Sequence, residues 1–378
     1  MSQHSGASRA IAGLIGASAL TMLLALASQP ATHSSAQTVL QATPVAAASP
    51  ISAVMVAARV LVPAPAEADV LYAAGGLARS ADGGTTWESA GPPPPPGRII
   101  VAADDPLLLL NGARPPCAKG DPNPPLLQRS DDGGASWLPI ASAPGVEPLA
   151  LWADTQVAVG ASCAGLLIST DAGQTWPDRP PALMDPGYDI SAFSLIASAD
   201  PSVRTALVLG TSEGGTSTLR RLDLTSPAQP MASDILITFW GGASLAGRAE
   251  ENGETFVVGT ANGVLISTDG GASWTSSRIG LEAVTLSVDP NKERIPDAEL
   301  NRGFGIPAVA FDSTREGRFF AGTVDGLYAS ADGGVSWQRV PGVDGIVTQI
   351  VAASNSGNLV LQTDRKVLTL ALADTETE

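Results

Sequence analysis

Lysine, histidine and cysteine are scarce in this 378-residue chain, and what is missing excludes several classes of function. Only three lysines occur, and 21 Lys and Arg stand against 37 Asp and Glu, so the net charge is −16 and the pI is near 4.4. This balance argues against nucleic acid and against anionic membrane surfaces as partners. It favours solubility and is compatible with a basic partner.

The first 36 residues have the pattern of an export signal. Arg9 precedes an uncharged stretch over residues 10–27, and small residues near Ala27 and Ala36 offer cleavage positions. We expect residues 1–36 to be a cleaved signal peptide and the protein to be secreted or extracytoplasmic. An uncleaved membrane anchor is the alternative, because the apolar stretch is long for a signal core.

Both histidines, His4 and His33, lie inside this leader. The mature protein would therefore contain no histidine, which excludes His-based catalytic triads, His zinc sites and histidine general bases. We expect neither a metal nor a cofactor.

An eight-residue pattern, S-x-D-x-G-x-[ST]-W, occurs five times and organises the rest of the chain. We call each copy a box. The boxes span 80–87, 130–137, 169–176, 267–274 and 330–337, and they contain five of the seven tryptophans. Five copies of one pattern indicate a repeat protein in which every box has the same local purpose.

The residue types of a box predict a tight turn between two strands. The Asp carboxylate can accept bonds from backbone N–H groups a few residues on, and Gly allows the positive φ of the turn. The closing Trp offers a large apolar face for packing. We therefore assign a structural role to the ten box residues Asp82, Trp87, Asp132, Trp137, Asp171, Trp176, Asp269, Trp274, Asp332 and Trp337.

The boxes resemble the Asp-box, or bacterial neuraminidase repeat. That repeat occurs in sialidases, sortilin-type receptors, some xyloglucan hydrolases and photosystem II assembly-factor-like proteins. The resemblance implies an all-β fold, a β-propeller in which each box joins the third and fourth strands of a blade. It covers nearly all of the chain after the leader and is specific for fold, whereas one fold hosts many functions.

The spacing of the boxes predicts seven blades over residues 51–378. Five blades carry a box, and a sixth without one fills the 98 residues between Trp176 and Trp274. We place the inner strand of the first blade at 52–58 and the start of the fifth near Ile235. The last three strands lack a fourth, which residues 37–50 could supply as a closing outer strand; otherwise these residues are a linker. Six blades is the alternative count.

The two cysteines, Cys117 and Cys163, occupy the same kind of loop on adjacent blades. In an exported protein this suggests a disulfide, with two free thiols as the alternative.

A sialidase-like site would need three arginines, a tyrosine nucleophile with a glutamate partner, and an acidic aspartate. Arg294-Ile295-Pro296 copies a triplet of that family but follows the fourth box, whereas the family's triplet precedes its first. Tyr188 is the only tyrosine that we place in a loop. We therefore do not expect sialidase activity.

Function is expected on the face away from the boxes, with the charged loop 289–307 as its main contributor. The binding candidates there are Arg294, Asp297, Glu299, Arg302 and Phe304. The sequence favours a non-catalytic, monomeric binding or scaffold propeller whose partner is a protein or a glycan. The alternative is a glycoside hydrolase, which needs two suitably spaced carboxylates. Asp189, Asp297 and Glu299 are its weak catalytic candidates.

Overall fold

The computed structural model places residues 38–378 in one compact unit. It describes residues 42–44, 61–64, 67, 69–115, 124–177, 181, 183–184, 188–196, 203–212, 215–250, 253–287, 305–312, 314–353 and 355–372, and only the backbone at 42–44, 188 and 237–240. The leader lies outside these residues, so its export role stays a prediction. No helix in the described part of the chain is long and apolar enough to cross a membrane.

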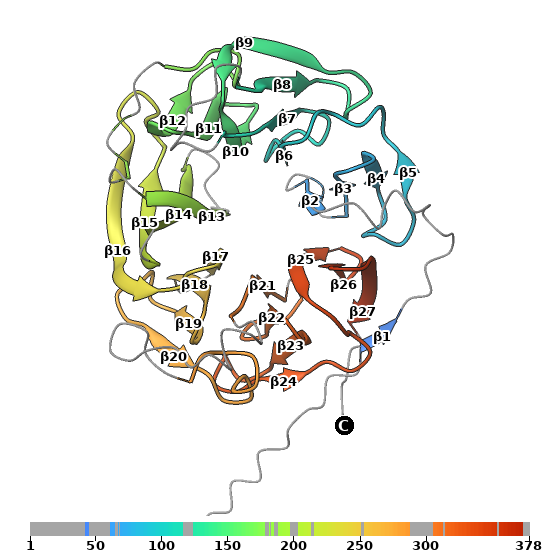
Figure 1. The fold of residues 1–378 in the computed structure, drawn as a ribbon, viewed down its shortest axis with the longest axis vertical. Helices are drawn as coiled ribbons and strands as arrows, with labels where there is room; N and C mark the ends of the chain where they lie inside the picture. Colours follow the sequence, from blue (N-terminus) through green and yellow to red (C-terminus); the bar gives the residue numbers. More distant parts are fainter. Residues whose placement is uncertain are drawn as a thin grey trace, which may run out of the picture. The chain divides into compact units, whose positions relative to one another are not determined.

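Seven antiparallel sheets stand around a central axis, which confirms the predicted all-β, seven-bladed propeller (Figure 1). Blades 1 to 3, from the inner strand outward, are β2 (Leu61–Pro63), β3 (Leu71–Ala73), β4 (Ala78–Ser80) and β5 (Glu88–Ser89); β6 (Arg98–Val101), β7 (Leu109–Gly112), β8 (Leu126–Ser130) and β9 (Leu138–Pro144); and β10 (Glu147–Trp152), β11 (Val157–Ser162) and β12 (Gly165–Ser169).

Blades 4 to 7 continue the ring in chain order. Blade 4 consists of β13 (Tyr188–Ile196), β14 (Thr205–Ser212), β15 (Thr216–Asp223) and β16 (Met231–Trp240), and blade 5 of β17 (Ser244–Glu250), β18 (Gly253–Thr260), β19 (Gly263–Ser267) and β20 (Thr275–Ser277). Blade 6 consists of β21 (Ala308–Phe311), β22 (Phe319–Thr323), β23 (Gly326–Ser330) and β24 (Gln338–Arg339). Blade 7 consists of β25 (Val347–Ala353), β26 (Asn358–Thr363), β27 (Val367–Leu372) and β1 (Ala42–Pro44).

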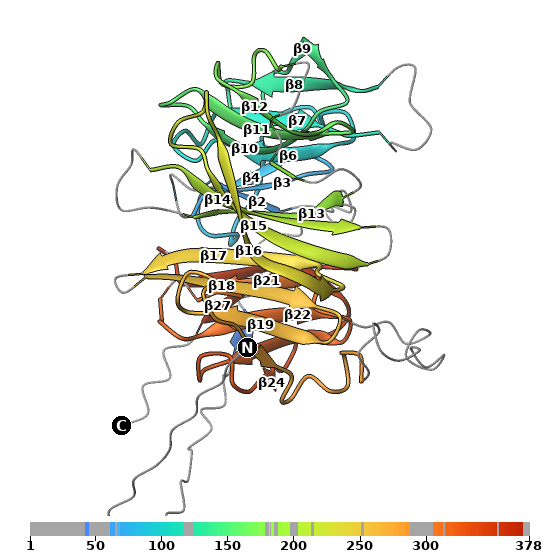
Figure 2. The ribbon, with the colours of Figure 1, turned by 90° about the vertical axis from the view of Figure 1, so that its left-hand side faces the viewer.

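The core of the propeller lies between neighbouring blades. Side chains alternate across each strand, so every sheet presents one apolar set to the blade before it and another to the blade after it. Val159 and Ile168 of blade 3 pack with Val208 and Leu222 of blade 4, for example, and similar clusters fill the other junctions. Seen from the side, the sheets form a stack of twisted layers (Figure 2).

Blade 7 joins the two ends of the chain and closes the ring. β1 pairs antiparallel with β27, with Ala42 opposite Leu372, so the segment before blade 1 supplies the missing outer strand. Inside the ring, the side-chain amide of Gln349 makes two hydrogen bonds to the backbone of Leu61. Its Oε1 accepts a bond from Leu61 N at 2.6 Å, and its Nε2 donates to Leu61 O at 3.4 Å. The closing blade is thus completed by β1 at its outer side and linked to blade 1 through Gln349 at its inner side.

Each box is a turn held by the same bonds. In the fourth, Ser267 Oγ donates to Asp269 Oδ1 at 2.8 Å, Asp269 Oδ1 accepts from Ser273 N at 2.8 Å, and Asp269 Oδ2 accepts from Ser273 Oγ. The other four boxes repeat this pattern. In every box the carboxylate accepts bonds from its own turn.

The box tryptophans differ in burial more than their shared motif suggests. Trp176 and Trp337 are 8% and 3% exposed, whereas the other three are partly buried. In three boxes the indole N–H donates to the carbonyl of the Gly at the fifth position of the box, as from Trp274 Nε1 to Gly271 O at 3.1 Å.

Each box also makes a backbone hydrogen bond to the turn that joins the first and second strands of the same blade. The backbone N–H of the fourth residue of the box donates to a carbonyl at the start of the second strand. In the first box, Gly83 N donates to Asp69 O at 3.0 Å. All five boxes make this bond. Boxes and first-to-second strand turns therefore lie on one face of the ring, which we call the box face, and the remaining connections lie on the open face.

Two details of the predicted strands were wrong. The inner strand of blade 1 is Leu61–Pro63 rather than 52–58: both segments are apolar, and only the pairing of Leu61 with Ala73 fixes the choice. Ile235 belongs to β16 of the blade without a box, where it packs toward blade 5 and so resembles an inner-strand residue. Among the described residues the sheet of blade 3 has three strands, and residues 178–180, 182 and 185–187, which follow its box, lie outside them.

Candidate functional site

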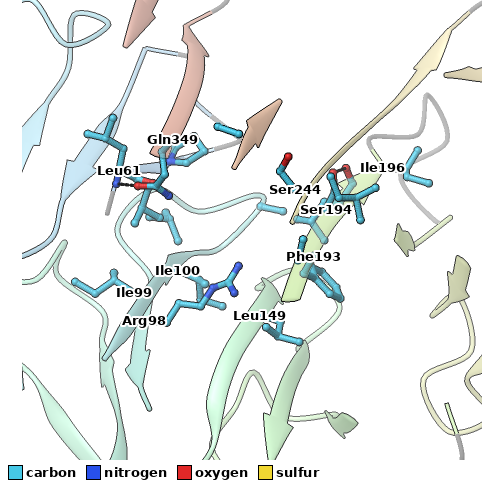
Figure 3. Close-up of a pocket in the computed structure, with 18 of the residues that line it drawn as sticks. Leu61, Arg98, Ile99, Ile100, Leu149, Phe193, Ser194, Ile196, Ser244 and Gln349 are labelled. Atoms are coloured by element: carbon cyan, nitrogen blue, oxygen red, sulfur yellow. Dashed lines mark hydrogen bonds between the residues drawn. The ribbon is translucent and has the colours of Figure 1, made fainter. Parts of the chain in front are cut away.

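The inner strands of all seven blades surround a cavity of about 1000 Å³ on the axis of the ring (Figure 3). Its wall is mixed with a modest apolar excess, and each inner strand contributes aliphatic or aromatic side chains. These include Val62, Ile100, Leu149, Phe193, Leu245, Val309 and Ile350. We call this cavity the channel, and it offers an apolar group a place to be buried.

The end of the channel at the open face carries an ion pair between blades 2 and 3. Arg98 and Glu147 are the first residues of β6 and β10, and their Nη1 and Oε1 atoms lie 3.4 Å apart. Figure 3 shows the Arg98 side chain reaching into the enclosed space. Arg114 and Asp189 form a second pair at the same face, with 3.2 Å between Nη2 and Oδ1.

The end of the channel at the box face carries a different group of charges. Asp104, Asp154 and Arg204 come from the first-to-second strand turns of blades 2, 3 and 4, and all three line the channel. Asp104 accepts bonds from Ala153 N at 2.6 Å and Asp154 N at 2.7 Å, while Arg204 Nη2 lies 2.5 Å from Asp154 Oδ2. Three successive blades are thereby joined through their turns.

The two carboxyl groups of this cluster titrate differently. The Asp104 side chain is exposed as a whole, but partial desolvation of its carboxyl raises its pKa, and a hydrogen bond with the Asp154 carboxyl raises it further. Burial also acts to raise the pKa of Asp154, but hydrogen bonds with Asp104 and Arg204 outweigh it and hold that pKa below the ordinary value. Asp154 is thus the more acidic member of the pair, and Asp104 is the member that gains a proton first.

Sequence reasoning missed these three residues, although their spacing was a usable signal. Asp104, Asp154 and Arg204 follow one another at intervals of 50 residues. The first two boxes are separated by the same 50 residues, from Trp87 to Trp137. Charged residues one repeat apart occupy equivalent turns of adjacent blades, so the period itself predicts that they meet.

The predicted site residues fall mostly outside the described part of the chain. Arg294, Asp297, Glu299, Arg302 and Phe304 lie there, so their binding and catalytic roles stay predictions. Asp189 is described: it lies in β13, its side chain is 75% exposed, and it pairs with Arg114. Tyr188 is the first residue of β13 rather than a loop residue.

The predicted disulfide cannot be followed to both cysteines, because Cys117 lies outside the described residues. Cys163 Sγ is 3.6 Å from the carbonyl oxygen of Pro115, two residues before Cys117 in the chain. The two cysteine loops therefore approach each other at the open face. Among the described residues no cluster of three or more His, Cys, Asp or Glu side chains is suited to a metal ion.

Comparison with known proteins relates this chain to others through its fold. No profile of a known protein family matches it. A probable oligoxyloglucan-reducing end-specific xyloglucanase of Neosartorya fischeri is 34% identical over 114 residues, which are 27% of this chain and 12% of that protein. The chain thus spans about an eighth of the length of this curated relative.

Two solved structures match this chain at low sequence identity. YCF48 bound to D1 peptide matches with a TM-score of 0.52 and 16% identity, over 90% of this chain and 97% of the other. A GH74 xyloglucanase from Xanthomonas campestris has a TM-score of 0.45 and 16% identity, over 85% and 66% of the two chains. At these identities the first likeness supports the propeller fold and says nothing about activity.

Proposed function

We propose that this protein is an extracytoplasmic binding propeller that receives an extended segment of a partner protein at its channel. The observation that carries the proposal is the channel itself. It combines about 1000 Å³ of space with apolar side chains from all seven inner strands and with charged groups at both ends. Apolar pockets with a few placed polar groups are the usual form of binding sites.

The charges at the open face support binding rather than catalysis. Asp189, the described catalytic candidate, faces Arg114, and Glu147 faces Arg98. Each carboxylate is thus engaged by an arginine side chain, an arrangement that suits recognition or structure. A propeller that resembles this one in fold, YCF48, has been solved with a peptide bound, which is compatible with a peptide ligand here.

Export and the disulfide belong to the same proposal. The leader would direct the chain out of the cytoplasm, where a bridge between Cys117 and Cys163 can persist. That bridge would join the proline-rich insertion of blade 2 to blade 3 at the rim of the open face. Thiol counting on the exported, denatured and unreduced protein tests it, and two reactive thiols would contradict it.

A blocked channel tests the proposed function. Thr348 is exposed, lines the channel and sits at an irregularity of the β25–β26 pairing, so Thr348→Trp fills the space at little structural cost. The purified exported protein is panned against a library of random 12-residue peptides. We expect peptides with a shared apolar pattern, and we expect Thr348→Trp to lose their binding.

The matched control is Ser276→Trp, which adds the same side chain to the exposed outer strand β20. It should bind the selected peptides like the parent. If both variants bind equally well, the channel is not the site. If no peptide is recovered while the protein retains a glycan on an array or releases sugar from xyloglucan, the glycan-binding or hydrolase alternative replaces this proposal.

A further inference from the structure

The charged cluster at the box face has features beyond what joining three blades requires. Arg204 is 8% exposed at its side chain and is held by Asp154 through Nη2 alone. Its Nε is buried and has no hydrogen-bond partner among the described residues. A buried donor without a partner is costly, so a shift of the Arg204 side chain that brings this atom to an acceptor in the channel would be favourable.

The two carboxylates of the cluster are exposed to solvent, whereas the arginine side chain is buried. The Asp154 side chain is 48% exposed, Asp104 is also exposed, and both line the channel beside Trp152 and Phe193. With both acids ionised, the cluster carries one more negative than positive charge. The whole chain reinforces this sign with its net charge of −16.

We propose that this end of the channel binds a lysine or arginine side chain of a partner's peptide segment, with Asp104 and Asp154 facing the cation and Arg204 Nε facing a backbone carbonyl. The inference rests on the proposed function and adds the chemical identity of the bound segment. A peptide supplies both groups that the cluster lacks: a cation for the carboxylates and a carbonyl oxygen for the arginine.

The apolar wall next to the cluster suits the rest of such a side chain. Lysine and arginine carry an aliphatic stem that packs on apolar and aromatic surfaces while the charged end reaches a polar partner. Phe193 and Leu149 line the channel in the blades that hold Arg204 and Asp154. The stem would lie against these side chains and the charged end would lie at the box face.

The opposite end of the channel does not have the same preference. Arg98 and Glu147 form a pair with no net charge, so that end should tolerate neutral residues. An extended segment would therefore enter with its basic residue at the box face and its apolar residues along the wall.

Protonation of Asp104 provides a signature of this binding mode. Its neighbours with titratable or charged groups are Asp154 and Arg204, and its pKa lies above the ordinary value through burial and the Asp154 hydrogen bond. A bound cation favours the ionised form of Asp104, so affinity should fall as the pH drops through that pKa. A merely structural cluster would not couple to the charge of the ligand.

The test compares peptide selections on three forms of the full exported protein. The parent should recover 12-residue peptides that align on one Lys or Arg next to apolar positions. Asp104→Asn combined with Asp154→Asn should still recover peptides, but without the aligned basic residue. A parent-selected peptide should bind this double variant about tenfold more weakly or worse.

The matched control is Glu88→Gln, which removes one negative charge from the exposed outer strand β5, away from the channel. It should keep the aligned basic residue and the pH dependence of the parent, whereas Asp104→Asn alone should flatten the pH dependence. Melting curves of the variants confirm that each is folded. If the double variant does not fold, the inference is tested by Asp104→Asn and by the pH dependence of peptide binding to the parent.

Two results would overturn the inference while leaving the proposed function intact. One is a parent selection that yields channel-binding peptides with no aligned basic residue. The other is affinity for a basic peptide that does not change with pH or with Asp104→Asn. Failure to recover any channel-binding peptide would instead count against the proposed function.

Discussion

Blade 4, which has no box, and blade 1, which has one, differ in the interactions that hold their strands together. The strands of blade 4 have 9, 8, 8 and 10 residues, so its sheet is held by long ladders of backbone hydrogen bonds. Blade 1 has strands of 3, 3, 3 and 2 residues and relies on the bonds of its box. In blade 1 the side-chain bonds of the box thus accompany short ladders, whereas the boxed blade 5 has inner strands of 7 and 8 residues.

One bond is common to every blade. In blade 4, Leu224 N donates to Arg204 O at 2.8 Å, and in blade 7, Leu372 N donates to Gly357 O at 3.2 Å. These bonds link the end of the third strand to the start of the second, in the same way as the bond from Gly83 to Asp69 in blade 1. The box is thus one of several ways to form a bond that the blade geometry requires.

The largest expected effect is the loss of a fully packed box tryptophan. Trp337 is 3% exposed, packs with Val264, Ile266 and Phe319 across the junction of blades 5 and 6, and donates to Ser277 Oγ at 3.1 Å. Trp337→Ala should lower the free energy of unfolding by about 3–5 kcal/mol. Trp274→Ala, at a partly buried position, should cost less; equal urea midpoints would show that burial does not set the contribution of a box.

Acid should weaken the boxes before it affects the ladders of blade 4. Hydrogen bonds from Ser136 and Ser273 to the carboxylates hold the pKa of Asp132 and of Asp269 at about 2. The pKa of each is below its unfolded value, so this stabilisation is present above about pH 4 and disappears as the pH falls through about 2. We expect the urea midpoint to fall over this interval, and Asp132→Asn with Asp269→Asn to reduce the fall; an unchanged pH dependence would contradict the assignment.

The third test uses the one box that lacks its first glycine. Ala172 has a φ of 55° where Gly270 has 67°. Gly270→Ala should cost about 1–2 kcal/mol, because a side chain is strained in this conformation. Ala172→Gly should raise stability by about the same amount, since it reverses the same differences in strain and in the freedom of the unfolded chain. Effects of clearly different size in thermal unfolding would mean that the boxes do not share one backbone requirement.

The smallest expected effect separates two boxes by a single hydrogen bond. Trp87 Nε1 donates to Gly84 O at 3.0 Å, whereas Trp137 Nε1 is buried with no partner among the described residues. Trp87→Phe should therefore cost about 1 kcal/mol more than Trp137→Phe. Denaturant titrations of the two variants measure the difference, and a larger loss for Trp137→Phe would contradict it.

The box motif predicted what is local and repeated. Five boxes located the turns, their spacing located the box-free blade, and the unpaired last strands pointed to closure by the segment that forms β1. The motif could not choose between equally apolar segments, so the inner strand of blade 1 was misplaced. Pairing partners decide such cases, and a pattern of hydropathy does not contain them.

The channel cluster was missed because its members come from separate turns. Asp104, Asp154 and Arg204 each resemble an ordinary turn residue, and only the ring brings them together. The sequence instead directed attention to the charged loop 289–307, which lies mostly outside the described residues. Comparing residues one blade period apart would have indicated the cluster.

Hydrogen–deuterium exchange of the protein with and without its tightest selected peptide tests the central claim, that the channel is the binding site. The account predicts slower exchange in the inner strands β6, β10 and β13 and in the turns that hold Asp104 and Asp154, with little change in the outer strands β9, β16 and β20. Protection confined to the outer strands, or to residues 288–304, with unchanged exchange in the inner strands would contradict it.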